Sequence, residues 1–145
     1  MRRSIQSFLS KYQFRLLRNS IGVLFIWFGL LKFFPGVSPA EDLATETIRI
    51  LSFNLLQKNI SLPLLAVLEV GLGVLLVFTK EFKVTFWLLL FHMACTIMPL
   101  ILLPEVTFKK IPFQLTIEGQ YIIKNFVIIS AAFVLLFAHK DQTNS

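Results

Sequence analysis

The feature that most constrains the fold is a set of four long apolar stretches in a chain of only 145 residues. Each is close to the roughly 20 residues that an α-helix needs to cross a ~30 Å hydrocarbon layer. Charged residues make up only 15% of the chain, too few to cover a water-soluble domain of this size. We therefore expect an all-α, integral membrane four-helix bundle in one domain. Its predicted spans are residues 16–34, 62–79, 84–103 and 120–138.

The basic residues are unevenly distributed along this chain. The first eighteen residues contain five Lys or Arg and no acidic residue, which is typical of a segment held at an anionic membrane face. Four spans place both termini on one side, and that side carries seven Lys and Arg outside the spans, against four on the other. This bias predicts cytoplasmic termini. We expect the lipid bilayer, and no nucleic acid, to be the partner of the net positive charge.

The first outer loop is patterned like the start of a helix. Ser38, Pro39 and Glu41 fit an N-cap, a first-turn proline and a capping-box glutamate. We therefore expect an amphipathic helix over about 39–56, lying on the bundle or in the membrane interface. Its predicted apolar stripe is Ala44, Ile48, Leu51 and Leu55.

The second outer loop covers residues 104–119. Pro104 and Pro112 argue against a long helix here. The segment 108–117 is compatible with an extended conformation.

Each predicted span carries one ionisable residue, namely Lys32, Glu69, His92 and Lys124 in chain order. A charge in hydrocarbon costs on the order of 2.5–3.5 kcal/mol on insertion scales, so these side chains should face the bundle interior and find partners. At 1.5 Å per residue, Glu69 lies about 9 Å below Pro63 and Lys124 about 7 Å below Gly119, so the two are at similar depths. We therefore expect an ion pair between them.

Small residues on the same helix faces support a polar pocket in the outer half of the bundle. Gly29 shares a face with Lys32, and Gly73 shares one with Glu69, as expected where membrane helices approach closely. The predicted pocket residues are Lys32, Glu69, His92, Thr96 and Lys124, with Glu118, Gln120, Tyr121 and Asn125 near the mouth.

Simpler interpretations of these residues remain open. Glu69 with Lys124 is also explained as a structural ion pair that sets helix register. Lys32 is close enough to the span end to extend to the outer headgroups, and a lone His92 is typical of a hydrogen-bonded core histidine.

Several chemistries are not expected from this sequence. The single cysteine, Cys95, excludes an intramolecular disulfide, a CxxC pair and a cysteine-based zinc site. His92 is mid-span and His139 ends the last helix, so the two do not form a haem site at one level. The sequence contains no nucleotide loop, HExxH motif or serine-nucleophile motif. We expect no haem and no metal.

Three segments carry a family resemblance. They are FIWFGLLKF at 25–33, LEVGLGV at 68–74, and EGQY at 118–121 followed by Lys124-Asn125. In this order and spacing they resemble the DoxX-like superfamily of small four-helix membrane proteins, especially the branch that contains reactive-chlorine-resistance proteins. The resemblance implies a bacterial inner-membrane location and a link to redox or oxidative-stress physiology.

Two functions follow from the resemblance together with the predicted pocket. In the first, the pocket binds a quinone or another small molecule, with Lys124 or Lys32 holding a carbonyl or anion, Glu69 as counter-ion or proton acceptor and His92 as a proton relay. The chain would then be an accessory subunit of a quinone-linked oxidoreductase, because it lacks the groups for redox catalysis on its own. In the second, the chain is a non-catalytic interaction or assembly protein for a membrane partner or a second copy, and its ion pair is structural.

Overall fold

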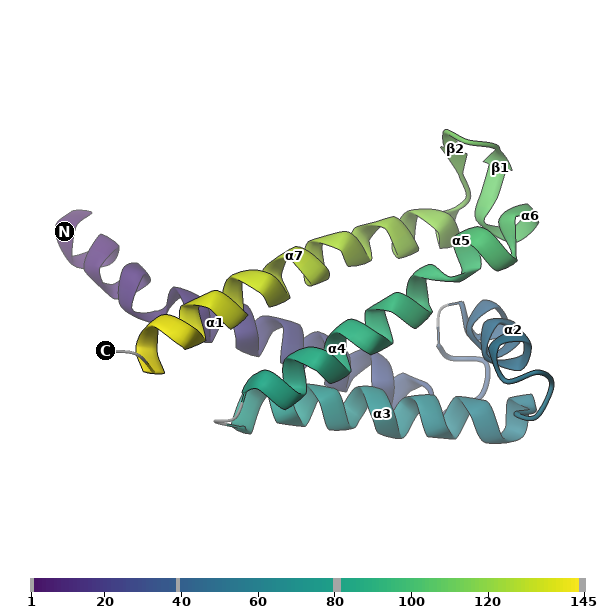
Figure 1. Ribbon diagram of the computed structural model, residues 1–145, viewed down its shortest axis with the longest axis horizontal. Coiled ribbons are helices and arrows are strands. Elements are labelled where there is room, and N and C mark those ends of the chain that lie inside the picture. Colours follow the sequence, from purple (N-terminus) through teal and green to yellow (C-terminus); the bar gives the residue numbers. More distant parts are fainter. Residues whose placement is uncertain (1, 39, 80–81, 144–145) are drawn as a thin grey trace.

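The computed structural model describes residues 2–38, 40–79 and 82–143, with side chains described between residues 12 and 138 of those ranges. Four long helices form the bundle (Figure 1): α1 (Arg2–Leu31), α3 (Lys58–Phe78), α4 (Phe82–Ile97) and α7 (Ile117–Thr143). Four stretches of 20–22 residues in the described part of the chain are long and apolar enough to cross a membrane. The expected set of four membrane-length helices is therefore confirmed.

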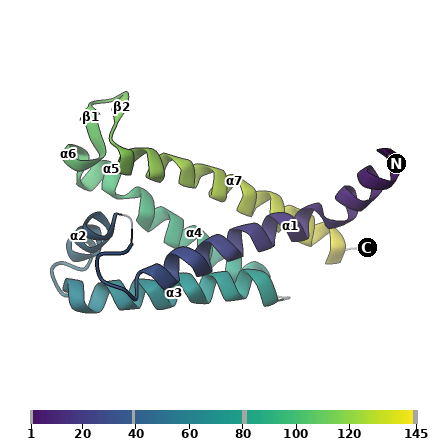
Figure 2. The ribbon, with the colours of Figure 1, turned by 180° about the vertical axis from the view of Figure 1, so that it is seen from behind.

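The two ends of the bundle differ. α1 begins and α7 ends at one end, which we call the termini end. The opposite loop end carries the short elements (Figure 2). These are α2 (Glu41–Leu51), α5 (Pro99–Leu102), α6 (Pro104–Thr107) and an antiparallel hairpin of β1 (Phe108–Lys110) with β2 (Gln114–Leu115). The extended conformation expected within 108–117 is present in these two strands.

The third span is interrupted near the loop end. α4 ends at Ile97 and α5 begins at Pro99, because a proline has no N–H to donate to the carbonyl of Cys95 four residues earlier. The Met98 N–H instead donates to the Cys95 carbonyl at 3.3 Å. The single helix expected over 84–103 is therefore two helices joined at Met98.

α1 and α3 cross with their backbones in contact. A Cβ atom placed on Gly73 would lie 2.6 Å from the Gly22 carbonyl oxygen, and one on Gly29 would lie 2.9 Å from the Val70 nitrogen. Real Cβ atoms do not approach other atoms this closely, so the crossing requires glycine at these positions. The small residues seen in the sequence therefore mark a real helix contact.

Arg18 fixes the termini end of this helix pair. Its guanidinium donates to the carbonyls of Leu75, at 3.4 Å, Leu76 and Thr79, and lies 5.7 Å from the centroid of the Phe82 ring. The last carbonyls of a helix have no partner within the helix. Arg18 of α1 therefore caps the C-terminus of α3 and holds the start of α4 beside it.

The buried apolar residues form two clusters. The larger lies between the four long helices, and the smaller joins α2 to the loop-end halves of the bundle. The larger contains Ile21, Phe25, Leu72, Leu76, Phe82, Phe86, Leu89, Met93, Ala132 and Leu135, and the smaller contains Leu43, Leu103 and Ile122.

The start of α2 differs from the expected capping box. The N-cap residue is Ala40, with a left-handed backbone (φ 54°), and it makes no side-chain cap hydrogen bond. The carboxylate of Glu41 instead accepts the Gly36 N–H at 2.7 Å and lies 3.2 Å from the Lys58 ammonium. Pro39 lies outside the described residues. Glu41 therefore ties the preceding loop and α3 together, where the sequence had predicted a cap.

The buried face of α2 also differs from the predicted apolar stripe. Ala44 and Ile48 are only partly buried, Leu51 and Leu55 are exposed, and the helix ends at Leu51 instead of residue 56. The buried residues are Glu41, Leu43, Thr45 and Thr47.

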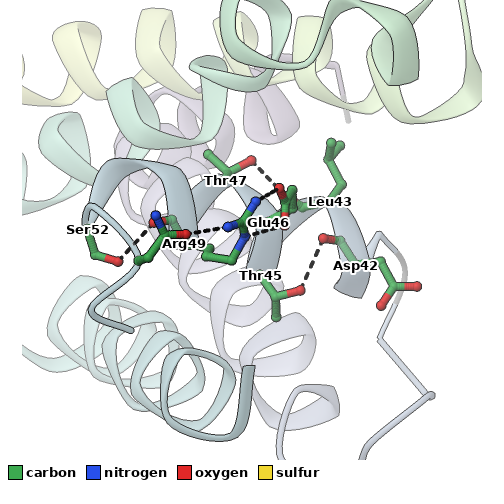
Figure 3. Close-up of polar contacts among 8 residues, drawn as sticks. Asp42, Leu43, Thr45, Glu46, Thr47, Arg49 and Ser52 are labelled. Carbon is green, nitrogen blue, oxygen red and sulfur yellow. Dashed lines mark hydrogen bonds and ion pairs between the residues drawn. The ribbon is translucent and has the colours of Figure 1, made fainter. Parts of the chain in front are cut away.

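Two threonines can be buried on α2 because the helix itself satisfies their hydroxyl groups (Figure 3). The Thr47 Oγ1 donates to the Leu43 carbonyl at 2.7 Å, and the Thr45 Oγ1 donates to the Asp42 carbonyl at 3.1 Å. The apolar stripe predicted from the sequence is therefore not the part of α2 that is buried against the bundle. Thr45 and Thr47 are about 200° apart around the helix, so α2 is buried on two sides.

We expect Gly73→Ala to destabilise the bundle, because its new Cβ would press on the backbone of α1. Overpacking of this kind costs about 1–3 kcal/mol. Gly71→Ala, two residues away on α3, is the matched control, since a Cβ there meets nothing within 4 Å. Thermal unfolding of both variants in detergent would measure the difference. Equal melting temperatures would contradict the backbone contact.

Candidate functional site

The site is built on an ion pair between α1 and α3. The Lys32 Nζ donates to Glu69 Oε2 at 2.6 Å, and the two side chains are only 11% and 10% exposed. Lys32 is placed there by the glycine crossing, since a Cβ on Gly29 would lie 3.0 Å from the Glu69 Cβ. Lys32 therefore turns inward to Glu69 and does not extend to the headgroups.

His92 of α4 joins the same carboxylate. Its Nε2 lies 3.4 Å from Glu69 Oε1, and the histidine is 4% exposed. The Phe25 ring of α1 packs edge-on against the imidazole, with the ring centroids 5.4 Å apart. One carboxylate thus contacts two nitrogen groups from two other helices. We call these three residues the Lys32–Glu69–His92 cluster.

The cluster lies near the middle of the membrane-length helices. Glu69 is eleven residues from Lys58 and nine from Phe78, the two ends of α3. His92 is ten residues from each end of the candidate span Phe82–Leu102. The site is therefore deeper than the outer half of the bundle that the sequence predicted.

α1 ends level with the middle of α3, because Lys32 pairs with Glu69. Arg18 is level with the end of α3, because its guanidinium bonds the Thr79 carbonyl. From Arg18 to Leu31 the helix rises roughly 20 Å, whereas the 21 residues of α3 rise roughly 30 Å. Residues 32–38 continue as turns and bends, and residues 33–37 are exposed.

Lys124 lies outside the cluster, so the predicted pair of Glu69 with Lys124 is wrong. Lys124 is exposed, and its ammonium lies 5.1 Å from the centroid of the exposed Tyr121 ring. The buried face of α7 includes Gly119 and Ile122, and Lys124 is about 200° around the helix from Ile122. Its side chain therefore points away from the bundle.

A contact at the start of α7 explains this rotation. A Cβ on Gly119 would lie 2.1 Å from the Thr107 carbonyl oxygen, so this side of α7 must face α6. The Thr116 N–H donates to the same carbonyl at 3.0 Å. These contacts turn Lys124 away from the bundle. The apolar residues that follow in α7 have no clear periodicity, so the sequence did not predict which side of α7 faces the bundle.

A second polar link joins α4 and α7 one turn from His92. The Asn125 Nδ2 donates to Thr96 Oγ1 at 3.2 Å, and that hydroxyl donates to the Met93 carbonyl at 2.8 Å. The structure thus brings together two of the predicted pocket residues. Of those predicted near the mouth, Glu118 is partly buried and Gln120 is exposed.

An apolar groove of about 310 Å³ lies elsewhere on α1. At about 100° per residue, it occupies the flank of the helix opposite Phe25 and Lys32. It therefore does not open onto the cluster. Its lining residues are Val23, Ile26, Trp27, Leu30 and Leu31.

The cluster has the groups to hold a polar ligand atom. A lysine ammonium has three N–H donors. The contacts of Lys32 are the short one to Glu69 and a long one, 3.5 Å, to the Phe28 carbonyl, which leaves donor capacity for a carbonyl or anionic oxygen. Among the described residues, no group of three or more His, Cys, Asp or Glu side chains could hold a metal ion.

Comparison of the chain with family models, with curated proteins and with solved structures found no match. The DoxX-like resemblance therefore rests on the three sequence segments alone.

We expect Lys32 and Glu69 to be coupled energetically, and Lys124 and Glu69 to be independent. A double-mutant cycle of Lys32→Met with Glu69→Gln, measured by unfolding in mixed micelles, should give an interaction energy of about 0.5–3 kcal/mol. The matched cycle of Lys124→Met with Glu69→Gln should be additive within about 0.5 kcal/mol. Coupling in the Lys124–Glu69 cycle together with additivity in the Lys32–Glu69 cycle would contradict the structure and support the pair predicted from the sequence.

Proposed function

We propose that this chain is a DoxX-like protein of the bacterial inner membrane, associated with redox or oxidative-stress physiology, that binds a quinone or a similar small molecule at the Lys32–Glu69–His92 cluster. The observation that carries the proposal is one buried carboxylate, near the middle of α3, that is shared by Lys32 and His92. Ionisable groups are costly in hydrocarbon, so those that persist there mark ligand and proton sites.

The position at which α1 ends supports the same site. In membrane proteins with interrupted helices, ligand and ion sites form where the helix ends meet near the midplane. Here the C-terminal end of α1 meets Glu69 of α3 and His92 of α4. The Lys32 ammonium also lies against the negative end of the α1 dipole. A positive charge is therefore stabilised at the position where a ligand oxygen would accept a hydrogen bond.

Each residue has a distinct role in this proposal. The Lys32 ammonium donates a hydrogen bond to a carbonyl oxygen of the ligand. Glu69 holds Lys32 in place and accepts a proton, and His92 exchanges a proton with Glu69. A quinone that receives two electrons also takes up two protons. The electrons come from a partner oxidoreductase, because this chain carries no dithiol and no haem motif, and this cluster handles the protons.

The proposed orientation places both termini in the cytoplasm. The excess of Lys and Arg at the termini end supports it. The loop end, with α2 and the hairpin, then faces the other side of the membrane.

A non-catalytic interaction or assembly protein is the second candidate, and one observation favours it. Within the described residues, no buried side-chain nitrogen or oxygen lacks a hydrogen-bond partner. A cluster that satisfies itself is also suited to fixing helix register. In this case, Lys32→Met combined with Glu69→Leu would leave the cellular phenotype intact while substitutions in α2 or the hairpin would abolish it.

The quinone proposal predicts a bound small molecule. Protein taken from bacterial membranes into nanodiscs and examined by native mass spectrometry should retain an isoprenoid quinone, with the matching ultraviolet absorbance. Glu69→Gln and Lys32→Met should lose it, because each removes one side of the ion pair. Lys124→Met is the control and should keep it, since Lys124 is exposed.

Folding of each variant is checked by circular dichroism and melting temperature. Wild-type protein without any retained small molecule, in both detergent and nanodiscs, would contradict the proposal. If the well-folded Glu69→Gln variant retains as much of the small molecule as the wild type, the binding site is not the cluster.

A further inference from the structure

The hairpin at the loop end has an apolar tip that no part of the bundle covers. Phe113 is 92% exposed and Ile111 is 66% exposed. A two-stranded hairpin is at best marginally stable in water on its own, and exposed aromatic tips on a monomer indicate a contact surface. We therefore expect the tip to contact something other than the rest of this chain.

The base of the hairpin is firmly attached. The Thr116 N–H donates to the Thr107 carbonyl at 3.0 Å, and the Thr116 hydroxyl donates to the Val106 carbonyl at 2.8 Å. The Gly119 N–H donates to that hydroxyl at 3.1 Å. The direction of the hairpin is thus determined by contacts with α6 and the first turn of α7.

That direction is sideways to the bundle. In Figures 1 and 2 the hairpin rises beside the start of α7, across the long axis of the molecule. It extends no farther along that axis than α2 and the start of α3 (Figure 1). Since the candidate spans end at Leu102 and begin again at Ile117, the hairpin stays at the level where the hydrocarbon layer meets the headgroups.

The chemistry of the hairpin matches an anionic headgroup layer. Residues 108–117 contain two lysines, Lys109 and Lys110, and no acidic residue. Both lysines are exposed on β1, directly before the apolar tip. Aromatic side chains favour the membrane interface, and each basic residue near an anionic surface contributes about 1 kcal/mol of attraction.

We propose that the 108–115 hairpin is a membrane-interface anchor, which inserts Ile111 and Phe113 beside the bundle while Lys109 and Lys110 bind the phosphates of anionic phospholipids. The anchor would hold the loop end, including α2 and the interrupted third span, at a defined depth. It does not depend on any ligand of the Lys32–Glu69–His92 cluster.

Depth measurement by spin labelling tests the insertion. In a Cys95→Ala background, which removes the single native cysteine, a nitroxide is attached at Phe113→Cys, and the protein is placed in phosphatidylcholine nanodiscs containing phosphatidylglycerol. We expect this label to be more accessible to oxygen than to a water-soluble nickel complex. The control label at Asp42→Cys, an exposed acidic position on α2, should show the opposite preference.

Three outcomes of the labelling would be decisive. Oxygen preference at Phe113 supports the anchor. Preference for the nickel complex would overturn it, because the tip would then lie in water. Low accessibility to both reagents, with dipolar broadening between labels, would show that the tip contacts a second copy of the chain. That outcome would also overturn the anchor.

Lipid selectivity tests the role of the lysines. Native mass spectrometry of protein released from mixed nanodiscs should show retained phosphatidylglycerol, and Lys109→Gln with Lys110→Gln should reduce this retention roughly five-fold for each lysine removed. Lys83→Gln, at an exposed lysine of α4 near the termini end, is the control for loss of a positive charge outside the hairpin. A double variant that retains as much phosphatidylglycerol as that control would contradict headgroup binding by the hairpin.

Discussion

The contact between the backbones of α1 and α3 is the constraint on which the rest of the structure depends. Gly22, Gly29 and Gly73 remove the side chains that would keep the two helices apart. The close approach brings Lys32 to within 2.6 Å of Glu69. Arg18 secures the other end of the same pair by capping α3. The polar cluster is therefore a consequence of helix packing by small residues, which is the usual way that helices associate where lipid removes the hydrophobic driving force.

The position of the cluster follows from the length of α1. Its helix ends at Leu31, below the level reached by α3, and the chain continues as turns. The last carbonyl groups of a helix have no partner within the helix. Lys32 is the first residue beyond that end, its ammonium lies 3.5 Å from the Phe28 carbonyl oxygen, and Glu69 neutralises its charge. The same arrangement places a charged pair beside the middle of α3.

The loop end is organised by polar contacts around α2 and the hairpin. Buried Thr45 and Thr47 satisfy their hydroxyl groups within α2, which lets a helix be buried on two sides that carry polar residues. Partly exposed Glu46 pairs with exposed Arg49, and the hydrogen bond from Arg49 lowers the pKa of the Glu46 carboxyl below its usual range. The hairpin adds an apolar tip and two lysines. The proposed lipid anchor is therefore at this end, and the cluster lies nearer the middle of the long helices.

Length and hydropathy are local properties, and they were enough to predict the four membrane-length helices, the common end of the termini and the extended outer segment. They were not enough to choose Lys32 over Lys124 as the partner of Glu69, or to identify the residues that α2 buries. Both depend on how a helix is rotated about its axis. In α7 that rotation is set by Gly119 against Thr107, a contact between separate elements. A helix of almost continuous apolar residues carries no periodicity from which its orientation can be inferred, so the orientation of α7 follows from its contacts in the folded chain.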